Sequence, residues 1–497
     1  MTVCVCFIIV NGEFAASAAK KLATNNLFAP SGPPAQIKND AIGRRRLAGD
    51  FDLTCRAYRA HFQSGRHDLS PHARHYLTGL LGLHVRKNIG RIDERLATAN
   101  YQGMQQFISD SPWDAGALLR QIGRDAEALL GGHADTALYL DETSFAKKGD
   151  ASVGVQRQYC GRLGKMENCQ VGVFACLGQG ERAALVDFKL FLPESWVRDP
   201  ARCRKAKIPE AEWRHRTKAE LALVMVRQAR ELGLSHQWIG GDEVYGNNRP
   251  LTDALEDDGE VFLMDINRNH QLWDRDPMGR VPAAVPGRGR PATRRVADPQ
   301  AVRRSAAAWT EAGFAGACRP VTLRASTRGP LTAKLWVMPV WQWDPEDHRA
   351  RRRRLVVRQE ADGTFKYSLS NAAETVTWER LGYMQAQRFW IERAFQDAKS
   401  ELGMADYEVR SWNGWHHHMA LVCLALLFSV KERVALATHL PLLTVRDLVE
   451  LFEIYLPRRE RNETEIWAAM EQRHQARQRA IDSANKKHQP KPSEGSV

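Results

Sequence analysis

The sequence predicts an α/β fold in which a helical region precedes a sheet. Apolar and basic residues recur at helical spacing over residues 51–135, whereas short apolar runs rich in β-forming residues begin at residue 136. Two of these runs are separated by Gly178-Gln-Gly180, which is typical of a hairpin turn. With 497 residues, the chain is long enough for roughly two to four domains around a large core.

Three consecutive strands, which we expect to be antiparallel, open the sheet region, and helices and strands alternate after them. Each predicted strand is short, apolar and followed by turn residues, and the helix after the third strand is amphipathic. In chain order, the predicted elements are strands at 137–141, 168–177 and 183–192, a helix at 218–232, a strand at 236–242, a helix at 249–257 and a strand at 261–266.

Composition divides the rest of the chain. Prolines, glycines and basic clusters such as Arg288-Gly-Arg290 and Arg351–Arg354 break the alternation after residue 266, so we expect a β-rich insertion there. A long helix at 379–402 and an apolar helix at 419–436 follow. The expected divisions are a poorly ordered leader at 1–50, a helical domain at 51–135, the core at 136–266 and 371–440, the insertion at 267–370, and a C-terminal helical region at 441–497 that becomes a disordered basic tail from about residue 471.

The chain is strongly basic, with a net charge of +13. A basic chain of this size most often binds nucleic acid; an anionic membrane surface, or a basic enzyme without such a partner, are the alternatives that charge leaves open. The nine cysteines include no pair of C-x-x-C units, which predicts reduced thiols in a cytosolic compartment and no structural zinc site. Val3–Val10 is apolar but too short to span a membrane and lacks a basic flank before it.

Two predicted strands end in an aspartate, Asp141 in the first and Asp242 in the fourth. If the strands are neighbours in the sheet, the two carboxylates lie side by side and repel each other unless a cation lies between them. Hard divalent cations prefer such oxygen ligands. We therefore expect a metal site at this edge, with Glu142 pointing away from it. The alternative is that each strand ends in a solvated turn without a function.

A third acid is expected from the helix at 379–402. At about 100° per residue, Arg388, Glu392 and Lys399 lie along one border of the apolar face, whereas Asp397 lies on the far side and should be solvated. Glu392 is therefore the candidate, since a site with three acids is able to hold two divalent metals. An ion pair between Glu392 and Arg388, four residues apart, is an equal alternative.

Longer motifs accompany these acids. They are Asp141-Glu-Thr with Lys147-Lys-Gly149, Val155-Gln-Arg157-Gln-Tyr159-Cys-Gly161, Asn168-Cys-Gln170, Leu192-Pro-Glu-Ser-Trp196, Asp242-x-x-Tyr245-Gly246-Asn247 and Leu402-Gly403. In their order they resemble the DDE transposases of bacterial insertion sequences, and the resemblance covers about residues 50–435. It implies an RNase H-like catalytic core with a β-rich insertion before the last catalytic helix. The basic helical region at 51–135 then fits a DNA-binding domain, with a plain helical cap as the alternative.

The resemblance also implies a catalytic centre. Asp141, Asp242 and Glu392 match the metal-binding triad of such enzymes, which holds two Mg²⁺ ions per active site, with Mn²⁺ able to substitute. In the second motif, Glu243-Val244 stands where Ala-Gly is more usual, so an additional acid lies beside the site.

The long helix matches a signature spaced Y-x-x-R-x-x-x-E-x-x-x-x-x-x-K. Arg388, Glu392 and Lys399 fit it, but Gln385 stands at the tyrosine position. In relatives that tyrosine helps to handle a flipped base and a hairpin DNA end, so the departure argues against a hairpin pathway and leaves the metal chemistry unaffected. The residues expected to contact DNA are Lys147, Lys148, Arg157, Tyr245, Arg388 and Lys399.

The sequence thus predicts the transposase of an insertion sequence, which binds double-stranded DNA at terminal inverted repeats and joins the cut ends to target DNA. A homodimer on DNA and a cytoplasmic, nucleoid-associated location follow from the same resemblance. The alternatives are a catalytically degenerate repressor that still binds the ends, and a nuclease that does not transpose. His416-His-His418 is not expected to bind metal, because adjacent residues on a helix point in different directions.

Overall fold

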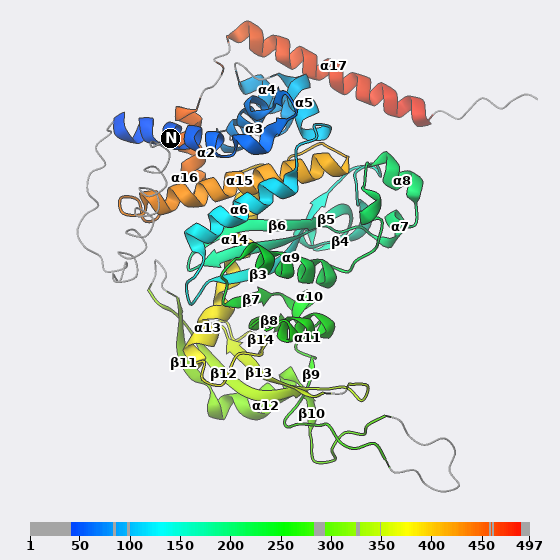
Figure 1. The fold of residues 1–497 in the computed structure, drawn as a ribbon, viewed down its shortest axis with the longest axis vertical. Coiled ribbons are helices and arrows are strands. Elements are labelled where there is room, and N and C mark those ends of the chain that lie inside the picture. Colours follow the sequence, from blue (N-terminus) through cyan, green and yellow to red (C-terminus); the bar gives the residue numbers. More distant parts are fainter. Residues whose placement is uncertain are drawn as a thin grey trace, which may run out of the picture.

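A large mixed sheet runs through the computed structural model of the chain, with helices packed along it (Figure 1). The structure describes residues 41–82, 86–96, 100–282, 294–324, 329–347, 349–456, 459 and 462–488. The expectations for Val3–Val10, for most of the leader and for Arg288-Gly-Arg290 lie outside these residues. The helical region occupies one end of the molecule and the insertion the other, with the core between them.

The core consists of five neighbouring strands in the order β6-β5-β3-β7-β8. Strands β3, β5 and β6 form an antiparallel group, and the other two run parallel to β3. This arrangement confirms the predicted RNase H-like α/β core. The strands are β3 (Ala137–Ala146), β5 (Lys165–Gln179), β6 (Arg182–Leu190), β7 (Trp238–Gly241) and β8 (Phe262–Ile266). Three consecutive strands were predicted here, but the short strand β4 (Gln156–Cys160) lies between β3 and β5 in the chain.

Local sequence explains most of these elements. The predicted hairpin forms at Gly180, whose φ of 56° favours glycine. Helix α9 (Lys218–Leu232) has the predicted bounds, because a capping box between Thr217 and Glu220 begins it and Gly233 ends it with a φ of 83°. Helix α11 (Arg249–Asp257) also has its predicted bounds.

One strand is longer than predicted. Asp141 was expected to end its strand, but β3 continues for five residues beyond it and pairs with β5 as far as Ala146 and Cys169. Thr143 and Phe145 are β-forming and buried, so the extended conformation continues past the acid. Asp141 therefore lies in the middle of a strand.

The insertion is β-rich, as predicted, and it extends the core sheet. Strand β14 pairs antiparallel with β8, and the sheet continues from β14 through β13 and β12. The elements of this part are β9 (Gln271–Trp273), β10 (Arg303–Ser305), α12 (Ala306–Ala317), β11 (Arg319–Arg324), β12 (Leu331–Gln342), β13 (Arg351–Gln359) and β14 (Phe365–Ser370).

The arginine run of β13 holds the insertion against the core. Arg353 is fully buried, and its guanidinium lies 3.1 Å from Asp253 Oδ1 and 2.8 Å from Glu256 Oε1, both on α11. Arg351 forms ion pairs with the same two acids. Intramolecular carboxylates therefore neutralise Arg351 and Arg353, so these two residues of the basic cluster do not serve as free cations.

Helices α13 (Trp378–Gln387) and α14 (Phe389–Ser400) occupy the region where a single long helix was predicted. They are divided at Arg388. Asp397 was expected to be solvated, but it is buried and forms a 3.0 Å ion pair with Arg393. The face of α14 opposite the apolar stripe was expected to be exposed, but α15 packs against α14, and its Arg433 lies near Asp397.

Long helix α15 (Trp412–Leu436) lies among the helices at the N-terminal end of the molecule and is buried over most of its length. His417 and His418 bond to protein partners, namely the backbone carbonyls of Ile108 and Trp113 and the Tyr76 hydroxyl. The histidine run thus serves packing. The surrounding helices are α2 (Ala41–Ala57), α3 (Ser70–Gly82), α4 (Ile89–Arg95), α5 (Tyr101–Ser109), α6 (Ala115–Leu130) and α16 (Val445–Tyr455).

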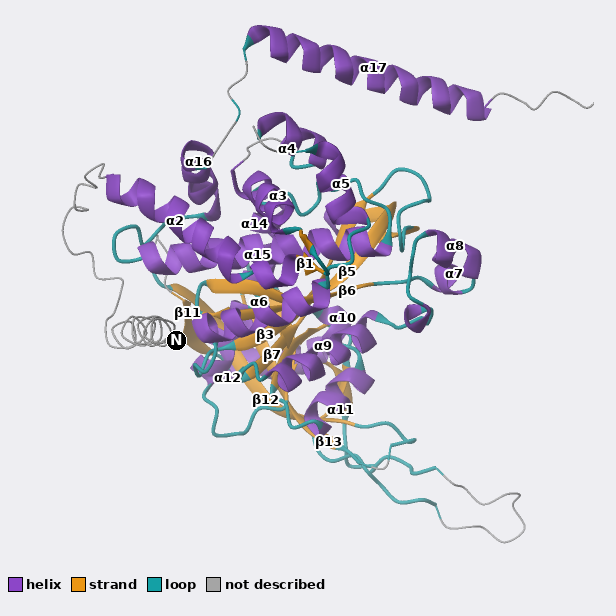
Figure 2. Cartoon of the chain, turned by 45° about the horizontal axis from the view of Figure 1, so that its top comes forward, coloured by secondary structure: helices purple, strands orange, loops and turns teal. Residues whose placement is uncertain are grey.

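Helix α17 (Glu463–His488) runs along the outside of the molecule (Figure 2). A disordered tail was expected from about residue 471, so this expectation differs from the structure. The segment is rich in alanine, glutamine, glutamate and arginine, which are strong helix formers, and its polarity alone does not prevent a helix. Among the helices of the described residues, none combines the length and the apolar character needed to cross a bilayer.

Candidate active site

The two predicted aspartates lie beside each other because their strands are parallel neighbours. Leu140 of β3 pairs with Gly241 of β7, so Asp141 and Asp242 occupy adjacent positions one residue further on. Asp242 also caps the short helix α10 (Glu243–Gly246) by accepting a 2.9 Å hydrogen bond from the backbone N–H of Val244. This part of the sequence prediction is confirmed at the level of strand geometry.

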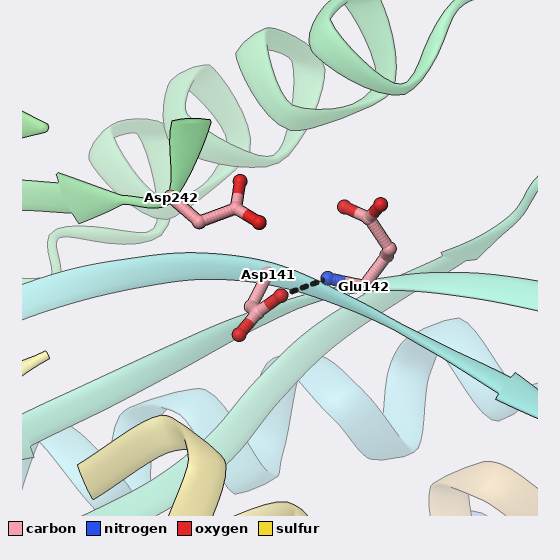
Figure 3. Close-up of side chains that lie close together, drawn as sticks. All are labelled: Asp141, Glu142 and Asp242. Carbon is pink, nitrogen blue, oxygen red and sulfur yellow. Dashed lines mark hydrogen bonds between the residues drawn. The ribbon is translucent and has the colours of Figure 1, made fainter. Parts of the chain in front are cut away.

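Glu142 joins this pair. Carboxylate oxygens of Asp141, Glu142 and Asp242 all lie within 4.8 Å of one another. Figure 3 shows Asp141 and Glu142 leaving β3 in opposite directions, as consecutive strand residues do, with Asp242 beside them. Glu142 was expected to point away from the site, and its side chain does leave β3 on the side opposite Asp141, yet its carboxylate lies close to both aspartates.

Two neighbours hold the Glu142 carboxylate. Lys218, the first residue of α9, lies 2.6 Å from Oε1, and the Tyr245 hydroxyl donates a 2.9 Å hydrogen bond to Oε2. Tyr245 comes close enough because α10 packs directly on β8. A Cβ at Gly246 would lie 1.9 Å from the Asp265 carbonyl oxygen, so only glycine permits this approach.

Burial makes the two aspartates hard to ionise. It raises the pKa of Asp141 to about 8, with the Asp242 carboxylate as the next cause. It also raises the pKa of Asp242 to about 6, and the Glu142 carboxylate adds to this shift. A divalent cation would compensate the clustered negative charge, and carboxylate oxygens are the ligands that Mg²⁺ prefers. The donor set therefore fits a divalent metal.

Glu392 stands apart from the three clustered carboxylates. It lies on α14 with about half of its side chain exposed, and its Oε1 is 2.9 Å from Arg388 Nη2. The alternative ion pair that the sequence left open is thus present. Arg388 also lies 3.8 Å from Asp141 Oδ2, so Glu392 is connected to the aspartates through this guanidinium.

Arg388 has a further partner that the sequence did not reveal. Its Nε donates a 3.0 Å hydrogen bond to Asp265 Oδ2 on β8. The register explains the position, since Met264 pairs with Gly241 and Asp265 follows it. An acid inside the apolar strand Phe262–Ile266 was the one sign in the sequence that Asp265 has a role. Its partner could not be identified, because Arg388 lies more than a hundred residues later in the chain.

Lys399 contacts β3 on the face that carries Asp141. Its Nζ donates a hydrogen bond to Thr143 Oγ1. Because Asp141 and Thr143 alternate with Glu142 along the strand, α14 and α9 lie on opposite faces of the sheet. The signature residues Arg388 and Lys399 therefore fix both ends of α14 beside the Asp141 face.

The other residues expected to contact DNA have different environments. Lys148 and Arg157 are exposed. Lys147 is half-buried, with its amine 3.3 Å from the Tyr407 ring centre, and burial lowers the pKa of Lys147 to about 7. Tyr245 differs most from the expectation, because it is fully buried and its hydroxyl positions Glu142.

Comparisons with known proteins agree with this geometry. A family model described as DDE superfamily endonuclease matches residues 58–330, which include both aspartates and exclude α13 and α14. A protein named probable transposase for insertion sequence element IS701, from Microchaete diplosiphon, is 25% identical over 191 residues. The aligned part covers 38% of this chain and 46% of that relative, so the chain spans about half the length of the curated protein that it matches.

Proposed function

We propose that this chain, which belongs to the DDE superfamily of endonucleases, is the transposase of an insertion sequence. It binds the terminal inverted repeats of its element as double-stranded DNA, cuts them and joins the resulting 3′ hydroxyl to target DNA. The observation that carries the proposal is the placement of Asp141 on β3 and of Asp242 directly after the adjacent parallel strand β7 in an RNase H-like sheet. The relative named as a probable transposase supports the same reading.

Asp141, Asp242 and Glu392 are the proposed metal ligands and catalytic residues, and Glu142 lies close enough to take part. When bound, two Mg²⁺ ions, or Mn²⁺ in their place, supply activation of the attacking oxygen and stabilisation of the leaving oxygen. The protein holds the metal-binding carboxylates in place. Lys218 and Tyr245 hold Glu142, and the strand pairing fixes the two aspartates before any substrate arrives.

Exposed cations of the core are proposed contacts for the DNA backbone. Lys148 follows the end of β3, Arg157 lies on strand β4 (Gln156–Cys160), which pairs with β5, and both are exposed. Arg388 and Lys399 reach the site from α14, and we propose that they hold the DNA strand beside Glu392. The net charge of +13 favours association with DNA.

The helical region at 51–135, which precedes the core, is the proposed DNA-binding domain. Two element ends require two active sites, so the proposed assembly is a homodimer on DNA. A cytoplasmic, nucleoid-associated location belongs to the same proposal.

The test uses the purified full-length chain and a duplex that carries the inverted repeat flanking its coding region. We expect Mg²⁺- or Mn²⁺-dependent nicking at the end of the repeat, followed by joining of that strand to a target plasmid. A duplex with a scrambled repeat is the control for the ends. Binding of the repeat without nicking would instead identify an end-binding repressor.

One observation favours that repressor as the second candidate. Glu243 is exposed beside Asp242 and adds negative charge where the DNA backbone must approach. Replacement of Glu243 by Ala separates the cases: in an active enzyme it leaves nicking intact or raises it, and in a repressor it strengthens end binding without any nicking. Nicking without joining, in either protein, would indicate a nuclease that does not transpose.

A further inference from the structure

A chain of hydrogen bonds leads from the signature position 385 to the acidic site. Gln385 Nε2 donates to Ser368 Oγ at 2.7 Å, and the Ser368 hydroxyl donates to Asp265 Oδ1 at 2.6 Å. The other oxygen of Asp265 accepts from Arg388 Nε at 3.0 Å. Arg388 then forms the ion pairs with Glu392 and Asp141 described above.

The direction of these bonds is determined by chemistry. A serine hydroxyl has one proton, and here that proton goes to the carboxylate of Asp265. The group that faces Ser368 from the other side must therefore be a donor, as the amide nitrogen of Gln385 is. A tyrosine hydroxyl could also donate, but Gln385 and Ser368 are both buried, and an amide fills this space with a shorter side chain.

Gln385 makes this bond at a cost. Its Oε1 is buried and has no hydrogen-bond partner among the described residues. A buried acceptor without a partner is destabilising, so a leucine would be the better choice if position 385 served packing alone. The presence of an amide at this position therefore indicates that its hydrogen bond to Ser368 has a role beyond packing.

Asp265 competes with Asp141 for the same guanidinium. Arg388 lies 3.0 Å from Asp265 but 3.8 Å from Asp141. If the charge or the orientation of Asp265 is lost, nothing else on β8 holds the guanidinium away from Asp141 in the described structure. Arg388 would then neutralise the carboxylate that a divalent cation needs.

We propose that Gln385, Ser368 and Asp265 form a positioning relay that draws Arg388 toward β8 and leaves Asp141 open to a divalent cation. The proposal rests on the metal-dependent function proposed above. In this relay the glutamine that replaces the signature tyrosine at position 385 has a structural role, because it acts on the metal site through Ser368, Asp265 and Arg388. All three are positioning residues, since they act through Arg388.

The test is Mn²⁺ binding to the full-length protein, measured from the electron paramagnetic resonance signal of free Mn²⁺. We expect Ser368→Ala, Gln385→Leu and Asp265→Asn each to raise the dissociation constant by roughly tenfold, the factor expected when one well-formed hydrogen bond is lost. In an Arg388→Met background, Asp265→Asn should no longer change Mn²⁺ binding, because the competing cation is absent.

Ser370→Ala is the matched control for Ser368→Ala. Both serines are buried on the same face of β14, but the Ser370 hydroxyl donates to the Phe262 carbonyl, away from the relay. The two alanine variants should lose similar thermal stability, while only Ser368→Ala weakens Mn²⁺ binding. If Ser368→Ala does not fold, Gln385→Leu tests the same relay, because it removes the hydrogen bond to Ser368.

Unchanged Mn²⁺ affinity in the three relay variants, with normal binding and nicking by the wild type, would overturn the relay and leave the proposed function intact. Absence of Mn²⁺ binding in the wild type would overturn the metal site and the relay with it. An equal loss of Mn²⁺ affinity in Ser370→Ala would also contradict the relay, since it would indicate a general effect of loosening β14.

Discussion

Asp141 has unlike neighbours on its two sides. Asp242 lies next to it, directly after the parallel strand β7, and Arg388 approaches it from the start of α14. The guanidinium lowers the pKa of Asp141, but burial and the second carboxylate outweigh that effect and raise it overall. Arg388 thus balances the negative charge of Asp141 only in part. This is expected of a carboxylate whose charge a bound metal ion would balance.

The sequence revealed some of these residues and not others. Asp141 and Asp242 were predictable because each follows an apolar run, and the order of strands makes these two runs neighbours in the sheet. Glu142 and Asp265 were not, since their roles depend on Lys218, Tyr245 and Arg388, which reach them from distant elements. Ser368 and Asp265, for example, are 103 positions apart in the sequence.

Glu432 lies away from the proposed site and shows how burial raises the pKa of a single carboxylate. It lies on α15, and one of its carboxylate oxygens is buried without a hydrogen-bond partner among the described residues. Burial, followed by the Asp50 charge, raises the pKa of Glu432 to about 7. The folded protein therefore binds more protons than the unfolded chain between about pH 4.5 and 7, so the stability contributed at this position falls as the pH rises through that window.

We expect Glu432→Gln to melt at a higher temperature than the wild type at pH 8, with a difference that shrinks toward pH 5. Thermal unfolding followed by circular dichroism at a series of pH values measures this. A pH-independent difference would contradict the assignment, because an amide and a carboxylic acid differ only where the acid ionises.

At the scale of elements, arginines of β13 connect the insertion to the core through α11. Breaking a buried ion pair by removing one partner leaves an uncompensated buried charge and costs about 3–5 kcal/mol. Arg353 has a fully buried side chain between Asp253 and Glu256. Arg352 precedes it with 52% of its side chain exposed and pairs with Glu374 at the surface.

Arg353→Met should therefore lower the free energy of unfolding by about 3–5 kcal/mol, whereas Arg352→Met should change it by less than about 1 kcal/mol. Urea denaturation of the two variants gives both values. Equal effects would mean that the buried network does not hold the insertion in place.

The whole sheet is the feature that the sequence predicted least well. Individual strands, helices and the β-rich character of the insertion followed from local patterns. The continuity of core and insertion did not, since it depends on the pairing of β8 with β14, two strands separated by most of the insertion. Pairing between distant strands is set by tertiary packing, which periodicity within a single segment does not encode.

The salt dependence of DNA binding tests whether the net positive charge of the whole molecule serves to bind DNA. If exposed lysines and arginines contact backbone phosphates, affinity for duplex DNA should fall by at least about tenfold between roughly 50 and 200 mM salt, the size expected for two or more phosphate contacts. Fluorescence anisotropy of a labelled duplex gives the slope of log affinity against log salt. A flat slope would count against the basic surface as a DNA contact.

We propose above that Asp141 and Asp242 belong to the metal-dependent centre of a DNA-cleaving enzyme. The most direct measurement is nicking of an end-containing duplex in Mn²⁺ by the wild type and by Asp242→Asn, which keeps the size of the side chain and removes its charge. We predict nicking by the wild type and a loss of at least about a thousandfold in the variant, with end binding retained. Nicking by Asp242→Asn at the wild-type rate would contradict the account.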